Sequence, residues 1–130
     1  MIQLGSMVRV IDNSGVKWVK VISFCKKRNT RYLYWGEMFK AVMRRFRRWR
    51  RKLKKPLIKR RQCWALVIAT KKKRLNFNCN CYFFSKKHQV ILFDFHGKPL
   101  GSRIFTKVPV LLRYLGFARF ISLSAGVIHI

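Results

Sequence analysis

Acidic residues are nearly absent from this chain of 130 residues, which contains three Asp and Glu against 31 Lys and Arg. The three acids, Asp12, Glu37 and Asp94, lie beside turn-forming residues or in an apolar run and form no cluster. Acid and base catalysis by paired carboxylates would require two of these three side chains to meet. The scarcity of acids therefore argues against an enzyme of that kind.

Motifs for metal binding and for nucleophilic catalysis are also missing. The four cysteines include no Cys-x-x-Cys pair and no histidine at zinc-site spacing, and no phosphate-binding or dinucleotide-binding glycine pattern occurs. Ser102, His96 and Asp94 can be written as a triad, but nearness in sequence is no evidence for one. We predict no enzyme activity, no metal and no cofactor, with the cysteines as small core residues in a reducing compartment. The cysteines and histidines considered as metal ligands are Cys25, Cys63, Cys79, Cys81, His88, His96 and His129.

Long apolar runs are lacking too. The longest segments without Lys, Arg, Asp or Glu, Leu75–Ser85 and Phe120–Ile130, are about half as long as the roughly 20 residues of a membrane-spanning helix. The N-terminus has no basic region followed by an apolar stretch, which argues against a cleavable signal. We therefore expect no transmembrane segment and no membrane partner.

Short strands dominate what is present. Alternating or apolar runs predict strands at residues 7–11, 18–24, 63–70 and 90–95, with a further candidate inside 32–42 after a turn at Gly36-Glu37. The Asp12-Asn13-Ser14-Gly15 stretch has the composition of a turn and predicts a hairpin between the first two strands. Half of the residues are apolar, enough for a modest core. Short strands at this spacing indicate a mainly β fold, a compact β-barrel, and we expect a single domain over residues 1–130.

Two smaller features complete the predicted fold. Residues 74–83 alternate almost strictly and predict a two-stranded ribbon that turns near Asn78. Pro109 in a first turn and Gly116 just past Leu115 predict a short helix over residues 108–116, and a second helical turn is expected at 117–121.

Residues 44–61 form the only low-complexity stretch, with 12 basic residues among 18. Charge of one sign at this density repels itself unless phosphate neutralises it, so we expect an inserted arm that binds RNA, with a merely solvated loop as the alternative. Its conformation is left open, because a helical stripe ended by Pro56 also fits the spacing. That stripe would contain Phe39, Met43, Phe46, Trp49 and Leu53.

The formal charge of +28 predicts a polyanionic partner. Basic residues alternate with aromatic ones, as in Arg31-Tyr32 and Arg48-Trp49, and such pairs can neutralise phosphates and stack on unpaired bases. RNA offers more unpaired bases than duplex DNA does. No recognition helix of adequate length is expected, which disfavours sequence-specific DNA binding.

Several stretches together resemble the universal large-subunit ribosomal protein fourteen family. They occur in the family's order from residue 1 to about residue 128. The stretches around residues 12–15 and 101–105 are specific in combination. The stretches are Val10-Ile11-Asp12-Asn13-Ser14-Gly15-Val16-Lys17, Gly36-Glu37, Ala65-Leu66-Val67-Ile68 with Thr70-Lys71-Lys72, Gly101-Ser102-Arg103-Ile104-Phe105, and Phe117 with Ile121-Ser122-Leu123.

The resemblance implies a small five-stranded β-barrel with a projecting β-ribbon and short C-terminal helices. It also implies a structural role at the subunit interface of the ribosome. The expected partners are large-subunit rRNA, small-subunit rRNA through bridges, ribosomal proteins nineteen and three, and a ribosomal silencing factor. The interface or factor-docking residues would be Ser102, Arg103, Arg113 and Arg119, with Ser102 in place of the usual Thr and Arg119 in place of the usual Lys. The expected rRNA-binding residues are Arg9, Lys17, Lys20, Lys26, Lys27, Arg28, Arg31, Tyr32, Arg44, Arg45, Arg47, Arg48, Trp49, Arg50, Arg51, Lys71, Lys72 and Lys73.

The chain also departs from the family. The 44–55 region is longer than in bacterial relatives, and acids common in the family are missing at Leu111 and Gly126. Gain of basic and aromatic residues is typical of an organelle ribosome. Because the resemblance begins at Met1, we expect a mitochondrial protein encoded in the organelle.

Two other classes of protein compete with this hypothesis. A free RNA-binding translation or RNA-processing factor would carry similar charge, but it would cycle on and off ribosomes. A membrane-active cationic protein is the third possibility, and the strand pattern argues against it because no long amphipathic helix organises the basic face.

Overall fold

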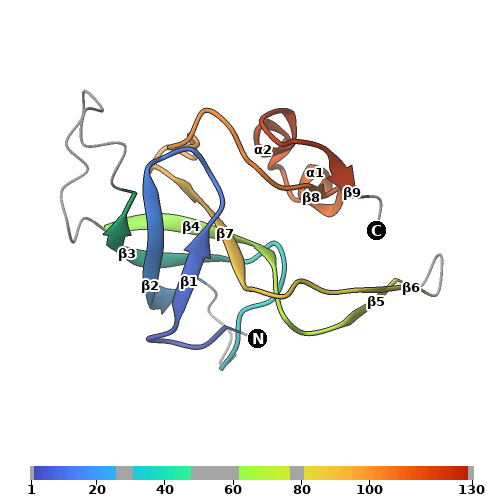
Figure 1. The fold of residues 1–130 in the computed structure, drawn as a ribbon, viewed down its shortest axis with the longest axis horizontal. Helices are drawn as coiled ribbons and strands as arrows, with labels where there is room; N and C mark the ends of the chain where they lie inside the picture. The colour runs from blue at the N-terminus through green and yellow to red at the C-terminus, as the bar shows by residue number, and fades with distance from the viewer. Residues whose placement is uncertain (1, 26–30, 48–61, 77–80, 129–130) are drawn as a thin grey trace.

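A computed structural model describes residues 2–25, 31–47, 62–76 and 81–128 of the chain (Figure 1). Its elements are β1 (Met7–Val10), β2 (Val16–Phe24), β3 (Met38–Phe46), β4 (Gln62–Ala69), β5 (Arg74–Asn76), β6 (Cys81–Phe83), β7 (Gln89–Phe93), β8 (Val108–Pro109), α1 (Leu111–Tyr114), α2 (Ala118–Ser122) and β9 (Val127–Ile128).

Five of these strands close into a barrel in the order β1-β2-β3-β4-β7. Neighbours in the barrel run antiparallel, except that β1 and β7 run parallel where the barrel closes. Closure leaves no barrel strand with an unpaired edge. The predicted mainly β fold with a five-stranded barrel and short C-terminal helices is confirmed.

The predicted hairpin between the first two strands is confirmed as well. β1 and β2 pair in antiparallel register, with Met7 opposite Lys20 and Arg9 opposite Trp18. Gly15 ends the connection at a φ of +88°, a conformation that glycine adopts without the steric cost of a side chain. The register turns Val8 and Val10 into the barrel and Met7 and Arg9 outward.

Alternation along the strands builds a core inside the barrel, because successive side chains of a strand point to opposite faces. All members are at most 8% exposed. They are Ile2, Val8, Val10, Val16, Val19, Val21, Leu33, Phe39, Ala41, Met43, Cys63, Ala65, Val67, Val90 and Leu92.

β4 and β7 are buried on both faces, which explains why their sequences are continuously apolar. Ala65 and Val67 of β4 point into the barrel, whereas Leu66 and Ile68 belong to a second core on its outer face. The C-terminal segment covers that face (Figure 1). The second core contains Ile11, Leu66, Ile68, Ile91, Phe93, Ile104, Val108, Leu112 and Phe120.

The first C-terminal helix is shorter than predicted, whereas α2 has the expected five residues and is displaced by one position from the predicted 117–121. α1 has four residues and is followed by Gly116 at a φ of +85°, as the predicted helix end requires. Pro109, however, lies in β8 and not in the first turn of a helix, so that expectation is wrong. The reason is a pairing of distant residues, in which β8 runs parallel to β9 with Pro109 opposite Ile128.

Two further expectations concern the ribbon and the arm. β5 and β6 pair as the predicted ribbon, which projects from the barrel (Figure 1); the expected turn near Asn78 lies outside the described residues. The helical stripe is wrong for Phe39, Met43 and Phe46, because these residues belong to β3 and pair with its neighbours. The first residues of the predicted arm, 44–46, belong to β3, whereas Trp49, Leu53 and all of the arm from residue 48 on lie outside the described residues.

Within the described ranges, no helix is both long and apolar enough to cross a membrane.

We predict that Phe120→Ala lowers the free energy of unfolding by about 3–5 kcal/mol, the usual cost of removing a large buried ring. Phe120 is 1% exposed and joins α2 to the outer face of β7. Urea unfolding in salt high enough to screen the positive charge measures the change. Tyr114→Ala is the control, because Tyr114 is 81% exposed and its loss is expected to change stability by no more than about 0.5 kcal/mol. Equal stability of the two variants would contradict the second core.

Candidate nucleic-acid interface

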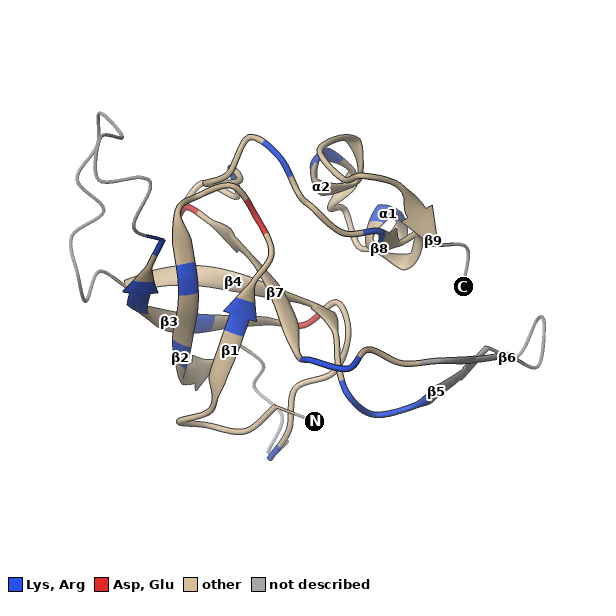
Figure 2. Ribbon diagram, in the orientation of Figure 1, with Lys and Arg blue, Asp and Glu red and all other residues tan. Residues whose placement is uncertain are grey.

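Two of the three acidic side chains are withdrawn from the surface. Asp12 is fully buried and Glu37 is 9% exposed, whereas Asp94 is exposed. Figure 2 shows how few acidic positions stand among the basic ones on the ribbon. The surface therefore carries almost undiluted positive charge.

The Asp12 carboxylate connects two parts of the barrel. Its Oδ1 accepts hydrogen bonds from the backbone N–H and the hydroxyl of Ser14, and its Oδ2 accepts one from the backbone N–H of Leu92 at 2.9 Å. Burial raises the pKa of Asp12 above its ordinary value, and these hydrogen bonds and the charge of Arg47 oppose that rise. The carboxylate thus ties the connection between β1 and β2 to β7.

The 12–15 loop packs directly against the 101–105 segment. The backbone N–H of Asn13 donates to Arg103 O at 2.9 Å, and Asn13 Nδ2 donates to Ser102 Oγ at 3.0 Å. Gly101 allows this approach, because a Cβ there would lie 2.9 Å from the backbone nitrogen of Asn13. The two stretches that carry most of the sequence resemblance are therefore one structural unit.

Glu37 has an analogous structural role in the 34–37 turn. Its Oε2 accepts a hydrogen bond from the backbone N–H of Tyr34 at 3.0 Å, and the turn is bonded to β4 through Gly36 N and Val67 O. Gly36 has a φ of +74° and lies against the residue that follows α1, since a Cβ there would lie 2.4 Å from Leu115 Cδ1. This acid holds the turn in place and contributes little charge to the surface.

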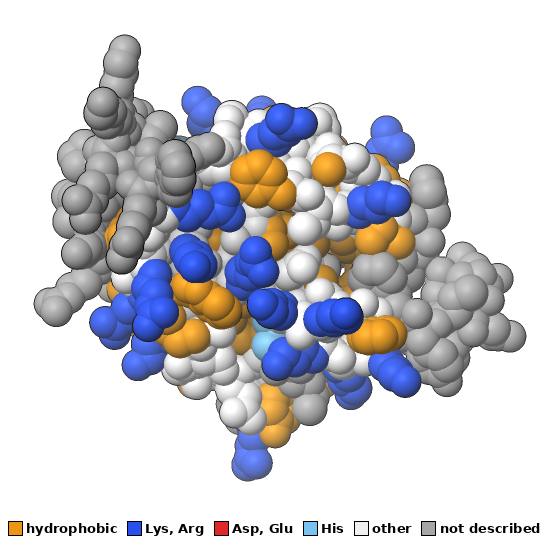
Figure 3. Space-filling model, in the orientation of Figure 1, with side chains coloured by type: hydrophobic (Ala, Val, Ile, Leu, Met, Phe, Trp, Pro, Cys, Tyr) orange, Lys and Arg blue, Asp and Glu red, His pale blue; other side chains and the backbone are white. Residues whose placement is uncertain are grey.

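Basic and aromatic residues form a row on the outside of the barrel. Arg9, Trp18 and Arg45 are neighbours across β1, β2 and β3, with both arginines exposed and Trp18 half-buried. Lys20 lies beside this row, opposite Met7. In the view of Figure 3, Lys and Arg side chains are spread over the visible face and no acidic side chain is in view. Such a face can bind phosphates along a nucleic-acid backbone.

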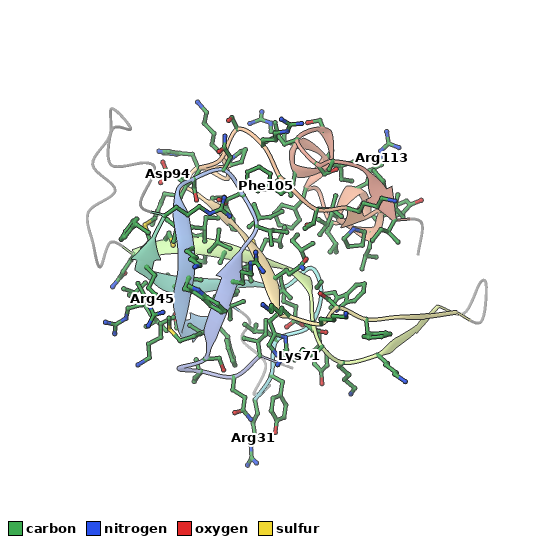
Figure 4. All side chains as sticks on the ribbon, viewed as in Figure 1. Arg31, Arg45, Lys71, Asp94, Phe105 and Arg113 are labelled. Atoms are coloured by element: carbon green, nitrogen blue, oxygen red, sulfur yellow. The ribbon has the colours of Figure 1, made fainter. Side chains whose placement is uncertain are left out.

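Four other predicted RNA-binding residues are also at the surface of the barrel or of the segment before β3. Lys17 and Arg44 are exposed on β2 and β3. Arg31 is exposed and Tyr32 half-buried before β3, and the side chains of Arg31 and Arg45 point outward in Figure 4.

Arg47 has a different environment from the other predicted RNA-binding residues. It is half-buried, its backbone N–H donates to Gly15 O at 2.8 Å, and its guanidinium lies over the ring of Phe105 at 5.2 Å. Arg47 therefore also helps to fix the 12–15 loop against the 101–105 segment.

Lys71, Lys72 and Lys73 are exposed where the ribbon leaves the barrel. Lys72 lies over the ring of Tyr34 and Lys73 over that of Phe84, each with 5.9 Å between the ammonium nitrogen and the ring centroid. The backbone N–H of Lys71 donates to His88 Nδ1 at 3.3 Å, and burial, with a smaller effect of Lys71, lowers the pKa of His88. Cationic and aromatic groups alternate here as on the barrel face.

The remaining predicted RNA-binding residues lie outside the described residues. They are Lys26, Lys27, Arg28, Arg48, Trp49, Arg50 and Arg51.

The four predicted interface residues are all exposed, on three different segments. Ser102 and Arg103 lie in the loop before Ile104, Arg113 on α1 and Arg119 on α2. The backbone N–H of Ile104 donates to Leu123 O at 2.8 Å, which holds the loop beside the end of α2. Arg113 points outward on the side of the molecule opposite Arg45 (Figure 4).

Comparison with known proteins places this arrangement in a family. The family model described as ribosomal protein L14p/L23e matches residues 1–128, nearly the whole chain. This chain belongs to that family. A similar protein is the large ribosomal subunit protein uL14c of Jasminum nudiflorum, which is 27% identical over 128 residues, 98% of this chain and 100% of that protein.

Membership of the L14 family defines the general role of the chain. It is a structural constituent of the large ribosomal subunit, where it binds rRNA and other ribosomal proteins. The members of this family are generally structural and not enzymatic.

The hypothetical triad has no support in the geometry of this L14-family protein. Asp94 Oδ1 accepts a hydrogen bond from the backbone N–H of Phe95, while Ser102 Oγ accepts one from Asn13. Of the cysteines whose side chains are described, Cys63 lies in the barrel core, as predicted, and Cys25 is half-buried with a free thiol. No group of three or more potential metal ligands occurs among the described residues.

Sequence reasoning missed three residues that shape the surface. Phe105 holds Arg47, and Lys40 lies over the ring of Trp64 at 5.2 Å. Trp64 lies in the predicted strand 63–70, where the apolar run indicates burial on both faces. The sequence therefore contains no sign that the Trp64 side chain is half-exposed on the outside of the barrel. Only the pairing of β3 with β4, which places Lys40 opposite Trp64, shows the contact.

We predict that Gly101→Ala lowers the free energy of unfolding by about 1–3 kcal/mol, the usual cost of overpacking. The added methyl group would meet backbone atoms of Asn13 and Ser14 and the Cβ of Asp12 at 2.9–3.1 Å, none of which can rotate away. Gly126→Ala is the matched control, because its Cβ would make only ordinary contacts, the nearest at 3.5 Å to Lys107. Urea unfolding compares the two variants, and equal midpoints would show that the 12–15 and 101–105 segments do not pack as described.

Proposed function

We propose that this L14-family protein is a structural component of the mitochondrial large ribosomal subunit that lies at the subunit interface and contributes to intersubunit bridges. In this proposal residues 1–130 form one ribosomal-protein domain, with residues 44–61 as a basic arm inserted in it. The observation that carries the proposal is the charge distribution of the barrel. Its outer face carries basic side chains, whereas two of the three acids are buried inside the fold.

The outer face of β1, β2 and β3 is the proposed rRNA-binding surface. Arg9, Lys20 and Arg45 supply positive charge there, and Trp18 supplies an aromatic ring between two of them. Phosphate contacts of this kind position a protein on RNA without reading its sequence. The lysines at residues 71–73 and the arm would extend the same contact.

The loop containing Ser102 and Arg103, together with Arg113 and Arg119, is the proposed interface surface. Arginine can bind a phosphate through two parallel hydrogen bonds, which suits a bridge to small-subunit rRNA. The Arg45 and Arg113 sides of the molecule are opposite one another (Figure 4), so one chain could contact RNA on both. The resemblance of the sequence supports contacts with ribosomal proteins nineteen and three and docking of a ribosomal silencing factor on the interface surface.

The mitochondrial assignment is supported by the departures of the sequence from its family. The surplus of basic residues, the longer 44–55 region and the 27% identity to a protein that covers nearly the same length all indicate strong divergence. We propose that the chain is encoded in the mitochondrion.

Cell fractionation tests the assignment. We expect the chain in mitochondria, in stoichiometric amount in large subunits that have been washed in high salt, as quantitative mass spectrometry would show. Release of the chain by the wash, at abundance well below that of core ribosomal proteins, would favour a free RNA-binding factor. Recovery from large subunits of another compartment would overturn the mitochondrial location alone.

We predict that Arg103→Glu combined with Arg119→Glu weakens the association of the two subunits about 10-fold to 100-fold, because each change removes a charge-assisted hydrogen bond and adds repulsion of phosphate. Sedimentation of reconstituted subunits over a range of magnesium concentrations measures the association. Lys86→Glu combined with Lys87→Glu is the control with the same charge change, since both lysines are exposed elsewhere. If the two double variants associate equally well, the interface surface is assigned wrongly.

A further inference from the structure

A series of aromatic rings in contact leads from the second core to the surface beside the C-terminal end of β7. Phe120 contacts Phe93 with ring centroids 5.9 Å apart, Phe93 stacks on Trp64 at 6.4 Å, and Trp64 meets Phe95 edge to face at 6.3 Å. The exposure of the rings rises along this series. Phe120 is 1% exposed and Phe95 is 80% exposed.

Phe95 stands in a turn whose backbone is well fixed. The backbone N–H of Asp94 donates to Lys98 O at 2.8 Å, and that of Gly97 donates to Asp94 O at 2.9 Å. Asp94 Oδ1 accepts from the backbone N–H of Phe95, also at 2.9 Å. A large exposed ring is thus held in place by its own turn and by Trp64, although its exposure leaves most of its apolar surface in water.

Two lysines place positive charge near the ring pair formed by Trp64 and Phe95. Lys40 is opposite Trp64 in the pairing of β3 with β4 and covers the Trp64 ring at 5.2 Å, which leaves Phe95 as the open ring of the pair. Lys98 and His96 flank it and are both exposed. The only acid nearby is Asp94, and one of its oxygens is engaged by the turn.

This combination matches the chemistry of an unpaired nucleotide. A base can stack on any open aromatic ring, and a stacked base brings a phosphate that needs a cation within reach. A protein partner would instead have to bring carboxylates or an apolar surface to a patch of positive charge.

Because β1 and β7 run parallel, the turn at Asp94 lies at the same end of the barrel as the 12–15 loop, and Asp94 is labelled there in Figure 4.

We propose that Phe95, supported by Trp64, is a stacking site for an unpaired rRNA nucleotide whose phosphate is neutralised by Lys40 or Lys98. The proposal rests on the ribosomal function proposed above and adds a specific ligand class and position to it.

Ultraviolet crosslinking of purified, salt-washed large subunits, followed by mass spectrometry of the chain, tests the site in its natural complex. We expect a nucleotide adduct on the peptide that contains Phe95. Nucleotide adducts on the β1–β3 face without any between residues 93 and 98 would overturn the stacking site and leave the proposed function standing. Absence of the chain from the subunit would overturn the proposed function itself.

Substitution of Phe95 in the full chain separates stacking from charge. Phe95→Leu keeps an apolar contact with Trp64 but removes the ring, Phe95→Tyr keeps the ring, and Tyr114→Leu is a control at another exposed ring. At about 0.5 M salt, where charge interactions are screened, we expect Phe95→Leu to weaken binding of a single-stranded oligoribonucleotide about 5-fold to 150-fold. The affinity of Phe95→Leu for an RNA duplex should stay within about twofold of that of the unmodified chain, and the slope of its affinity against salt should be unchanged. Phe95→Tyr and Tyr114→Leu should bind both the single strand and the duplex within about twofold of the unmodified chain. Equal loss for single strand and duplex, or no loss for either, would contradict stacking at Phe95.

Discussion

The buried carboxylate of Asp12 is the contact on which the placement of the proposed interface loop depends. It binds the 12–15 loop to β7, and that loop in turn receives the 101–105 segment through Asn13, with Gly101 small enough to permit the approach. A buried carboxylate is tolerated because its oxygens accept several hydrogen bonds. The loop that carries Ser102 and Arg103 therefore has a fixed position relative to the barrel, although it belongs to no regular strand or helix.

The same use of acids inside the fold determines the electrostatics outside it. Asp12 and Glu37 hold turns together, so 31 basic residues are balanced on the surface by little more than Asp94. A net charge of +28 opposes compactness and favours binding to a polyanion, and both effects are relieved when rRNA neutralises the charge. An aromatic side chain placed among the cations, such as Trp18 between Arg9 and Arg45, adds a surface on which a base can stack.

Much of the barrel could be predicted because its strands follow local rules. Alternation revealed β1, β2 and the ribbon, and the uninterrupted apolar run revealed a strand buried on both faces at β4. Features that depend on distant pairing could not be predicted. Pro109 pairs in β8 with a strand near the C-terminus, and Asn13 and Ser102 meet although they are 89 positions apart in the sequence. The half-exposure of Trp64 likewise depends on how much of β4 the C-terminal segment covers. The positive charge of the surface was evident from composition, but the two faces that we propose within it can be distinguished only in the fold.

The central claim is that the outer barrel face contacts rRNA while the Ser102 loop and α2 face the other subunit. A density map of the intact ribosome at side-chain resolution tests it most directly. The account predicts phosphates of large-subunit rRNA within hydrogen-bond distance of Arg9, Lys20 or Arg45, and small-subunit rRNA beside Arg103 and Arg119. A map in which the β1–β3 face is open to solvent, or in which Arg103 and Arg119 are buried within the large subunit, would contradict it.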